Sequence, residues 1–343
     1  MKIAILSTSY PRFDGDPSGH FVQADAERWA RSGARVAVLV PGSGGPAPTG
    51  GERHSLGAGD LFDWPGALAR ARERPVRLLQ AGPFVLRARR ALRVHGPWDR
   101  VVANFIVPSA WPACLGVDAP LEVRAHGADV RLLAALPRRF AGHVISTLLE
   151  RGAAFVFAAS SLRRTLLEAL PAGVATRLFE ASTVELPPLE MPARDALPSP
   201  AAELGTSDAY AVWVGRRVPE KRPALAARAA LAANVPIVFV GDGPEPLPPG
   251  VLVVGRVDRE VALGWIAGAR VLVSTSRDEA APSAVREARA LGVAVLSTPA
   301  GDVAEWARSD PGIQIFESER ALRDALRERF TRTSVTPSRR TCP

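Results

Sequence analysis

Cysteine and lysine are nearly absent from this chain of 343 residues. The two cysteines, Cys114 and Cys342, are far apart, so the sequence contains neither a disulfide framework nor the paired spacing of a zinc site. We therefore expect a reducing, cytoplasmic setting. The only lysines are Lys2 and Lys221, and arginine carries almost all of the net charge of +8. Such a positive balance favours anionic partners, such as nucleotide phosphates or an acidic membrane surface.

Long uninterrupted hydrophobic runs are also missing. Residues 101–117 come closest, but Asn104, Pro108 and Pro112 interrupt them, so we expect no membrane-spanning helix. The chain begins with Lys2 and a brief apolar run, which is typical of a first strand rather than of a signal peptide. The sequence has no RNA-binding strand motif and no recognition helix, so nucleic acid ranks last among the expected partners.

The hydrophobic content of 47% is sufficient for two cores, so two domains are expected. A hinge is predicted at residues 187–208, which are rich in proline and alanine. The N-terminal domain then covers residues 1–186 and the second domain covers 209–317. Residues 318–343 are expected to form a terminal helix that packs back on the first domain, followed by a disordered tail.

The N-terminal domain opens with a strand, a helix and a strand. Residues 2–7 read as a buried strand, 19–32 as a helix closed by Gly33, and 35–40 as the next strand. This order is typical of a doubly wound parallel sheet. No G-x-G-x-x-G turn follows the first strand, which argues against an ordinary NAD-binding protein.

Residues 76–94 mix apolar side chains with five arginines in the pattern of an amphipathic helix. Two interpretations stay open for this helix. It is either an ordinary helix with a solvated basic face or an interfacial helix that meets anionic lipid.

The second domain opens with a predicted strand at 210–214, followed by Gly215-Arg216-Arg217-Val218-Pro219-Glu220-Lys221. Pro219 and Glu220 suit the first turn of a helix. Arg216 and Lys221 would then flank a helix N-terminus, whose partial positive charge attracts anions. This combination predicts a diphosphate site, and a solvated basic turn is the alternative.

Residues 271–297 form a predicted strand–loop–helix–strand unit in which Pro282 opens the helix and Gly292 ends it. Glu279 stands before this helix, at the carboxyl edge of the sheet, where open α/β sheets bind ligands.

Glu287 falls on the apolar face of the same helix, where a carboxylate needs hydrogen-bond donors. It either accepts hydrogen bonds from ligand hydroxyls or forms an ion pair with an arginine such as Arg286 or Arg289.

These motifs resemble those of retaining glycosyltransferase family 4. The Glu-x7-Glu signature of that family is matched by Glu279 and Glu287 with Pro282, Gly292 and Gly301 in register. The family's Gly-Arg-x-x-x-x-Lys segment is matched from Gly215 to Lys221, and its Gly-x-Gly-Pro turn from Gly241 to Pro244. The resemblance implies an α/β protein of the GT-B fold, with two Rossmann-like doubly wound parallel-sheet domains that face a central cleft.

The resemblance also implies roles for individual residues. Arg216 and Lys221 would contact the donor diphosphate, Glu287 the ribose hydroxyls, and Glu279 a hydroxyl of the donor sugar. His126, in the segment His126-Gly127-Ala128-Asp129, would face the donor sugar. Nucleotide binding would involve Gly215, Val257, Pro282 and Ser283, and the acceptor-side loop would contain Gly15 and Gly19.

The implied activity is transfer of a hexosyl or related sugar from a nucleotide-diphosphate donor to a glycan or lipid-linked acceptor, with retention and without a metal or cofactor. We expect this activity in envelope polysaccharide or glycolipid synthesis, in the cytoplasm or at the inner face of the membrane. The chain also contains the D-x-D pattern Asp14-Gly15-Asp16, which binds metal and nucleotide in the other glycosyltransferase fold. It lies in an early turn, so we interpret it as turn chemistry.

Several positions depart from the family pattern. Ala280 and Ala281 replace the usual glycine and aromatic residue, and Asp302 replaces a glycine. After the strand near Val184, Glu185-Leu186-Pro187 stands where the family has Asn-Gly. These departures motivate a second hypothesis, a catalytically silent subunit that binds nucleotide sugars. A sugar-nucleotide epimerase of the same fold is the third.

Overall fold

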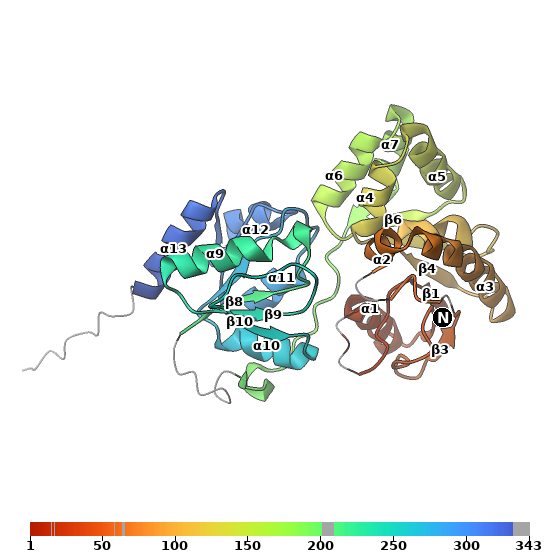
Figure 1. The fold of residues 1–343 in the computed structure, drawn as a ribbon. Helices are drawn as coiled ribbons and strands as arrows, with labels where there is room; N and C mark the ends of the chain where they lie inside the picture. The colour runs from red at the N-terminus through yellow and green to blue at the C-terminus, as the bar shows by residue number, and fades with distance from the viewer. Residues whose placement is uncertain (15, 17, 58, 64–65, 201–208, 332–343) are drawn as a thin grey trace, which may run out of the picture. The chain divides into compact units, whose positions relative to one another are not determined.

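The computed structural model describes residues 1–331, apart from 15, 17, 58, 64–65 and 201–208. The predicted disordered tail, most of it beyond residue 331, and the end of the predicted hinge lie outside the described residues. The chain divides into two compact units, unit 1 from Met1 to Glu190 and unit 2 from Met191 onward (Figure 1). Their boundary falls inside the segment 187–208 that was predicted to be the hinge.

Unit 1 is built around a parallel sheet of seven strands in the order β3-β2-β1-β4-β5-β6-β7 (Figure 1). The strands are β1 Lys2–Leu6, β2 Arg35–Val40, β3 Glu52–Ser55, β4 Arg100–Asn104, β5 Leu121–Ala125, β6 Ala154–Phe157 and β7 Ser182–Val184. The helices are α1 His20–Arg31, α2 Ala67–Glu73, α3 Ala81–Val94, α4 Ala128–Ala134, α5 Arg138–Glu150, α6 Ser160–Ala169 and α7 Ala172–Glu180. The apolar side chains of β1 have no exposed surface, as expected for a central parallel strand with both faces covered.

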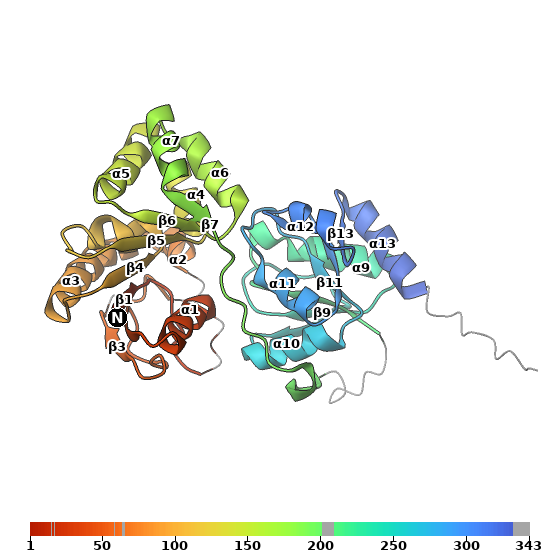
Figure 2. The ribbon, with the colours of Figure 1, turned by 180° about the vertical axis from the view of Figure 1, so that it is seen from behind.

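Unit 2 contains a parallel sheet of six strands in the order β10-β9-β8-β11-β12-β13 (Figure 2). The strands are β8 Ala211–Val214, β9 Ile237–Val240, β10 Leu252–Gly255, β11 Val271–Ser274, β12 Ala294–Ser297 and β13 Ile313–Ile315. The helices are α9 Pro223–Ala233, α10 Arg259–Gly268, α11 Ser283–Ala290, α12 Val303–Ser309 and α13 Glu319–Thr331.

Side chains alternate across the sheet of unit 2 and feed two separate apolar clusters. On β8, Ala211 and Trp213 join the cluster under α9 and α13, whereas Val212 joins the cluster under α10, α11 and α12. This alternation is the period-two pattern of a strand with both faces buried. The predicted doubly wound α/β architecture is therefore confirmed for both units.

The terminal helix packs within unit 2. α13 lies on α9, where Leu322, Ala325 and Leu326 join the core of that unit, and the expected packing on the first domain stays a prediction. A bidentate contact between Arg228 and Glu319 ties the two helices together at the surface. The apolar face of an amphipathic helix is thus buried within its own unit.

The boundary of the helix after β8 also differs from the expectation. Pro219 and Glu220 begin a short 3₁₀ turn that ends at Lys221, and α9 starts only at Pro223. Arg222 has left-handed backbone geometry, with φ of 48°, between the turn and the helix. At α11, Pro282 is extended and caps the helix, which begins at Ser283, and Gly292 ends it with the predicted positive φ.

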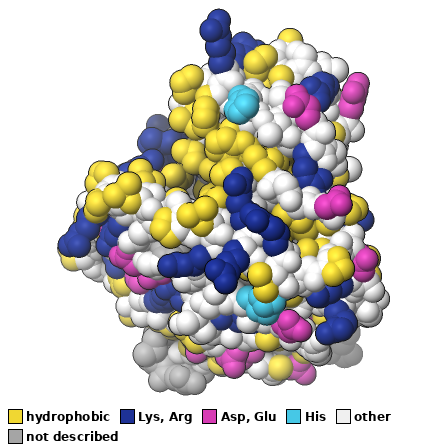
Figure 3. Space-filling model, turned by 90° about the vertical axis from the view of Figure 1, so that its right-hand side faces the viewer, with side chains coloured by type: hydrophobic (Ala, Val, Ile, Leu, Met, Phe, Trp, Pro, Cys, Tyr) yellow, Lys and Arg dark blue, Asp and Glu magenta, His cyan; other side chains and the backbone are white. Residues whose placement is uncertain are grey.

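The predicted helix at 76–94 is split into a 3₁₀ segment, Pro75–Gln80, and α3. Five large apolar side chains on these two elements are between 57% and 75% exposed: Val76, Leu78, Leu79, Leu86 and Val94. Figure 3 views the side on which α3 and α5 lie and shows hydrophobic side chains gathered there, with basic side chains beside them. None of the described helices has the length and apolarity that crossing a membrane requires.

Candidate functional site

The strand order of unit 2 reverses between β8 and β11. From β8 the chain proceeds to β9 and β10 on one side, and from β11 to β12 and β13 on the other. The loops that leave these two strands diverge, which opens the sheet at its carboxyl edge and makes this point the usual ligand site of doubly wound folds. The segments 215–222 and 275–282, singled out in the sequence, leave these two strands.

Lys221 and Glu279 meet at this edge, although 58 residues separate them in the chain. The Lys221 ammonium forms an ion pair with Glu279 Oε1, and the two side chains are only 22% and 17% exposed. The Ser276 hydroxyl donates to the same carboxylate oxygen at 3.1 Å. The structure therefore brings together the cation and the carboxylate that were predicted to contact the diphosphate and the sugar of a donor.

A buried hydrogen-bond network fixes the two loops against each other. The Thr275 hydroxyl lies 2.8 Å from the carbonyl oxygen of Lys221 and accepts from Trp213 Nε1 at 3.1 Å. The Arg222 guanidinium donates to the carbonyl of Thr275 at 2.7 Å and to that of Ser276 at 3.4 Å. Arg222 thus links the loop after β8 to the loop after β11, and its left-handed backbone conformation allows the side chain to reach the second loop.

Two glycines allow backbone segments to touch at this edge. A Cβ at Gly241 would lie 2.0 Å from the carbonyl oxygen of Gly215, and a Cβ at Gly243 would lie 2.3 Å from that of Arg217. The backbone N–H of Arg217 donates to the Asp242 carbonyl at 2.6 Å. The Gly-x-Gly-Pro turn therefore shapes the loop after β8, because only glycine fits at these close approaches.

Gly301 plays the same part beside Glu279. It has φ of +62°, and a Cβ there would lie 2.1 Å from the Ala280 carbonyl oxygen. The Asp302 N–H donates to that same oxygen at 3.2 Å. The loop that carries Glu279 is thereby held between β11 and the turn after β12.

Glu287 is only 7% exposed, and its Oε1 accepts a hydrogen bond from Arg259 Nη2 at 3.1 Å. The ion-pair interpretation of this buried carboxylate is thus realised with Arg259 of α10, and the charge of Glu287 also raises the pKa of Arg286 against the effect of burial. Arg289 pairs with Asp310. The partner was not foreseen because α10 and α11 are adjacent only in the folded sheet.

The remaining predicted residues of unit 2 lie along the same edge. Gly215 and the half-buried Arg216 directly follow β8, and Val257 follows β10 and packs on the α10 side of the core. Pro282 and Ser283 form the start of α11. All of these positions follow strands of one sheet, as a nucleotide site at its carboxyl edge requires.

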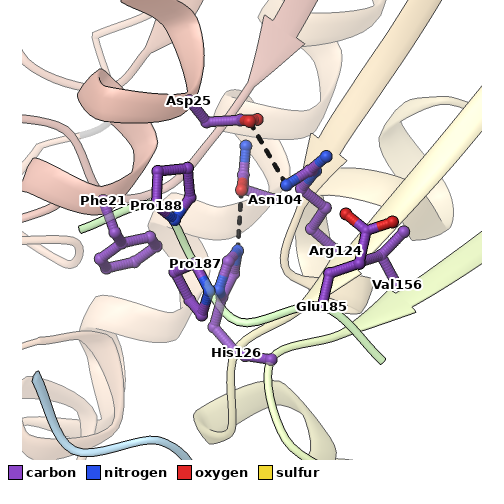
Figure 4. A pocket seen from close by; sticks show the side chains of 10 residues that line it. Phe21, Asp25, Asn104, Arg124, His126, Val156, Glu185, Pro187 and Pro188 are labelled. Atoms are coloured by element: carbon purple, nitrogen blue, oxygen red, sulfur yellow. Dashed lines mark hydrogen bonds and ion pairs between the residues drawn. The ribbon is translucent and has the colours of Figure 1, made fainter. Parts of the chain in front are cut away.

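A pocket in unit 1 lies where the order of its own sheet reverses, between β1 and β4. The space between its lining atoms amounts to about 270 Å³ and is partly open to solvent. The lining side chains come from α1, from the ends of β4, β5 and β6, and from residues 185–188 (Figure 4): Phe21, Asp25, Asn104, Arg124, His126, Val156, Ala158, Glu185, Pro187 and Pro188.

His126 is held on all sides in this pocket. Its Nε2 donates to Asn104 Oδ1 at 2.7 Å, and its ring packs against Phe21 and Phe105 with centroids 4.6 and 5.1 Å away. Burial, reinforced by the charge of Arg124, lowers the pKa of His126 to about 3. The imidazole is therefore neutral near pH 7, with a fixed orientation.

Asp129 organises the turn that follows β5. Its carboxylate accepts backbone hydrogen bonds from Ile106, His126 and Gly127 at 2.8, 3.2 and 3.0 Å. Gly127 has φ of 125°, which favours glycine at this place. Each fixed residue of the His-Gly-x-Asp pattern therefore has a structural reason: Asp129 and Gly127 form the turn, and the turn positions His126.

Asp25 and Arg124 form the charged wall of the pocket. Asp25 Oδ1 accepts from Arg28 at 2.8 Å and lies 3.3 Å from Arg124 Nη1. Glu122 holds the other side of Arg124 at 2.7 Å and also pairs with Arg100 at 2.9 Å. Burial raises the pKa of Asp25, and the two arginines oppose that shift.

Sequence reasoning missed Asp25, Asn104 and Arg124. A signal was present, because Asp25 lies among the apolar positions of α1 and Arg124 alternates with apolar residues in β5. A charged residue at such a position needs a buried partner. The identity of the partner depends on tertiary packing and could not be inferred from spacing.

The predicted acceptor-side loop is described only in part. Gly19, with φ of 70°, caps α1, and a Cβ there would lie 2.6 Å from the backbone of Tyr10. Gly15 lies outside the described residues. Asp16 of the D-x-D pattern accepts from the backbone N–H of Ser18 at 2.9 Å and of Arg12 at 3.2 Å, as turn chemistry requires. In the described part of the chain, no three side chains among His, Cys, Asp and Glu are grouped so that they could hold a metal ion.

Comparison with known proteins identifies the fold. Residues 209–331 match the family model described as "Glycosyl transferases group 1". No curated protein matches the chain. The resemblance predicted for the second domain is thus confirmed as group 1, and the assignment to family 4 stays a prediction.

Solved structures resemble the whole chain at low sequence identity. HepE of Anabaena in complex with UDP-glucose has a TM-score of 0.65 at 16% identity, covering 96% of this chain and 89% of that one. WaaG, "a glycosyltransferase involved in lipopolysaccharide biosynthesis", has 0.67 at 17%, covering 96% and 90%. Sucrose-phosphate synthase from Thermosynechococcus elongatus has 0.62 at 18%, covering 97% and 94%. The predicted GT-B fold is confirmed.

Proposed function

We propose that this protein is a retaining glycosyltransferase that moves a hexosyl or related sugar from a nucleoside diphosphate donor to a glycan or lipid-linked acceptor. One observation carries the proposal. Lys221 and Glu279 meet at the switch point of unit 2, inside the residues that match the group 1 model. Solved relatives of this fold include complexes with UDP and UDP-glucose, which supports a nucleotide sugar as the ligand.

In the proposed reaction, unit 2 holds the donor. Arg216 and Lys221 stabilise the charge that builds on the leaving diphosphate, and Glu287 accepts from the ribose. When the diphosphate binds, it replaces the Glu279 carboxylate as the partner of Lys221, and Glu279 then accepts a hydrogen bond from a hydroxyl of the sugar. The pairing of Lys221 with Glu279 keeps both charges satisfied while no donor is bound.

The acceptor oxygen attacks the anomeric carbon on the face from which the diphosphate departs. The bond from this carbon to the diphosphate breaks, and the leaving phosphate oxygen takes the proton of the acceptor hydroxyl. His126, neutral because its pKa is lowered to about 3, contributes a polar contact to the sugar without adding a charge. Metal independence and the lack of a cofactor are part of this proposal.

A screen of nucleoside diphosphate sugars by thermal shift, followed by assays of diphosphate release with glycan and lipid acceptors, tests the function. NMR of the product reports whether the anomeric configuration is retained. Arg216→Ala and Glu287→Ala should abolish transfer, and turnover that survives both changes contradicts the proposal. Binding without any product would favour the silent subunit motivated by Ala280, Ala281 and Asp302, and isomerised donor would favour an epimerase.

We also propose that unit 1 contacts an anionic membrane through the arginine-rich apolar face, which comprises residues 66–97. This segment carries eight arginines and a single acidic residue, Glu73. The exposed side chains of Leu79 and Leu86 are available for insertion between lipid headgroups. Each basic residue near an anionic surface contributes about 1 kcal/mol, and the leucines add apolar burial. Such a location, with the cytoplasmic setting predicted above, suits an envelope or lipid-linked acceptor.

Vesicle sedimentation tests this surface. Binding should require anionic lipid, weaken with salt, and fall about tenfold or more in the double variant Leu79→Glu, Leu86→Glu. Phe179→Glu, an exposed apolar position on α7, is the matched control and should bind normally. Equal binding to neutral vesicles, or an unaffected double variant, would refute the membrane contact.

A further inference from the structure

The pocket of unit 1 contains a buried donor and a buried acceptor that have no partner among the described residues. Asn104 Nδ2 and Asp25 Oδ2 are both shielded from solvent without a hydrogen bond, and their residues are only 1% and 2% exposed. Figure 4 shows the nitrogen end of the Asn104 side chain turned toward the Asp25 carboxylate. Each such orphan group is costly, so the arrangement calls for a ligand atom or group that can satisfy both.

An alcohol hydroxyl matches this pair. Its oxygen can accept from Asn104 Nδ2 while its hydrogen is donated to Asp25 Oδ2. Hydrogen bonds to a charged carboxylate are stronger than bonds between neutral groups, so the bond to Asp25 would be the dominant contact.

The charges around the pocket disfavour an anion. Arg28, Arg100 and Arg124 are balanced by Asp25 and Glu122, which pair with them, and by Glu185 in the lining. The Arg124 side chain, only 8% exposed, is enclosed by two of these carboxylates. A phosphate or carboxylate would therefore meet Asp25 without gaining a guanidinium of its own.

The rest of the lining is apolar. Phe21, Val156, Ala158, Pro187 and Pro188 surround the polar pair. One polar pair surrounded by apolar walls matches the chemistry of a sugar ring, which presents hydroxyls at its edge and C–H groups on its faces.

We propose that Asp25 and Asn104 bind one hydroxyl of an uncharged sugar, which belongs to either the acceptor or the donor. This inference rests on the proposed function for its biological meaning, but binding is measured without turnover. Because both orphan atoms are shielded from solvent, the hydroxyl reaches them through a local shift of residues 185–188, which lie along the pocket and lead into the predicted hinge.

Ligand-observed NMR with neutral methyl hexosides as probes tests the site, with glucuronate as the charged counterpart. The wild type should bind at least one neutral methyl hexoside and should bind glucuronate at least tenfold more weakly. The isosteric changes Asp25→Asn and Asn104→Asp should each weaken binding about tenfold, since each removes one of the two contacts. Asp63→Asn, which alters a carboxylate paired with Arg12, is the matched control and should bind normally. Circular dichroism reports folding, and Asn104→Asp decides the matter if Asp25→Asn does not fold.

Calorimetry with UDP and UDP-glucose separates the two sources of the hydroxyl. If the hydroxyl belongs to the donor, Asn104→Asp weakens the binding of UDP-glucose and leaves the binding of UDP unchanged. If it belongs to the acceptor, both nucleotides bind normally and only the methyl hexosides lose affinity. The proposal is overturned if both variants bind every probe as the wild type does, or if glucuronate binds as well as the neutral sugars. It is also overturned if the wild type binds no methyl hexoside and Asn104→Asp leaves the binding of UDP-glucose unchanged. A failure of sugar transfer alone would contradict the proposed function and leave this site standing.

Discussion

Replacing Lys221 by methionine distinguishes a catalytic cation from a structural one. Methionine keeps an unbranched side chain that is one atom shorter, and it removes the charge. In the free protein the ammonium pairs with Glu279, and both side chains are partly exposed, at 22% and 17%. Because most of both side chains is shielded from solvent, leaving Glu279 without its cation costs more than breaking a surface pair, about 1–3 kcal/mol of folding free energy. The Ser276 hydroxyl remains bonded to Glu279 in the variant, so the carboxylate keeps a donor.

The expected effect on transfer is much larger. If Lys221 stabilises charge on the leaving diphosphate, its loss costs about 3–4 kcal/mol of the activation barrier. That difference corresponds to a decrease of roughly 10² to 10³ in kcat. The free energy of unfolding should fall by about 1–3 kcal/mol, which leaves the variant folded in the absence of denaturant, so the loss of kcat is separable from unfolding.

The assay measures diphosphate release at saturating donor and, in parallel, urea unfolding. Arg228→Met is the matched control, since Arg228 also forms an ion pair in unit 2, with Glu319, far along the helix from the strand edge. It should retain activity within about twofold, as expected when an exposed pair is removed. Turnover of Lys221→Met within about threefold of the wild type would refute the electrostatic role. So would an activity loss that is fully matched by unfolding.

Three further predictions concern a glycine, the buried imidazole and the buried carboxylate. Gly301→Ala should destabilise the protein by about 2 kcal/mol or more, because the new methyl group meets both a positive φ and a backbone clash. Gly33 has a positive φ but no atom within 4 Å of a Cβ, so Gly33→Ala should cost only about 1 kcal/mol. Equal costs of the two changes in urea unfolding would contradict this reasoning. Because the pKa of His126 is lowered to about 3 in the folded state, the unfolded chain takes up the imidazole proton at a higher pH than the folded chain does. The free energy of unfolding should therefore be highest above about pH 6.5 and should decrease as the pH falls toward 3, by about 2 kcal/mol at pH 5. His126→Asn should therefore show a shallower acid dependence in urea titrations, and an unchanged slope would argue against a neutral buried ring. If the Glu287 carboxylate bonds the ribose, Glu287→Gln should weaken the binding of UDP about tenfold in calorimetry. Arg259→Met removes the protein partner of Glu287 and should weaken UDP binding less. A larger loss in Arg259→Met than in Glu287→Gln would assign Glu287 a structural role.

The architecture of unit 2 could be predicted closely from local signals. The strand–loop–helix–strand unit expected over residues 271–297 is present, and its first strand, Val271–Ser274, stops where the apolar run gives way to polar residues. Gly292 ends α11 because it supplies a positive φ where the helix stops. The resemblance then identified Lys221 and Glu279, and their meeting follows from the strand order β8–β11.

The missed features depend on contacts between distant segments. The edge strand β3 is short and polar, so it carries no apolar period and reads as a loop. The packing of α13 on α9 could not be foreseen, because an amphipathic pattern predicts that one face is buried but not which surface covers it. Likewise, Glu287 finds Arg259 and Asp25 finds Arg124 only after the sheets have formed.

The self-contained packing of the C-terminal half has a practical consequence. Within the described residues, both apolar clusters of unit 2 draw only on positions from Met191 onward, with α13 supplying part of one of them. The proposed donor site could therefore be tested in a fragment that starts at Met191 and keeps the last helix. A truncation that removes this helix would expose the apolar face of α9 to solvent.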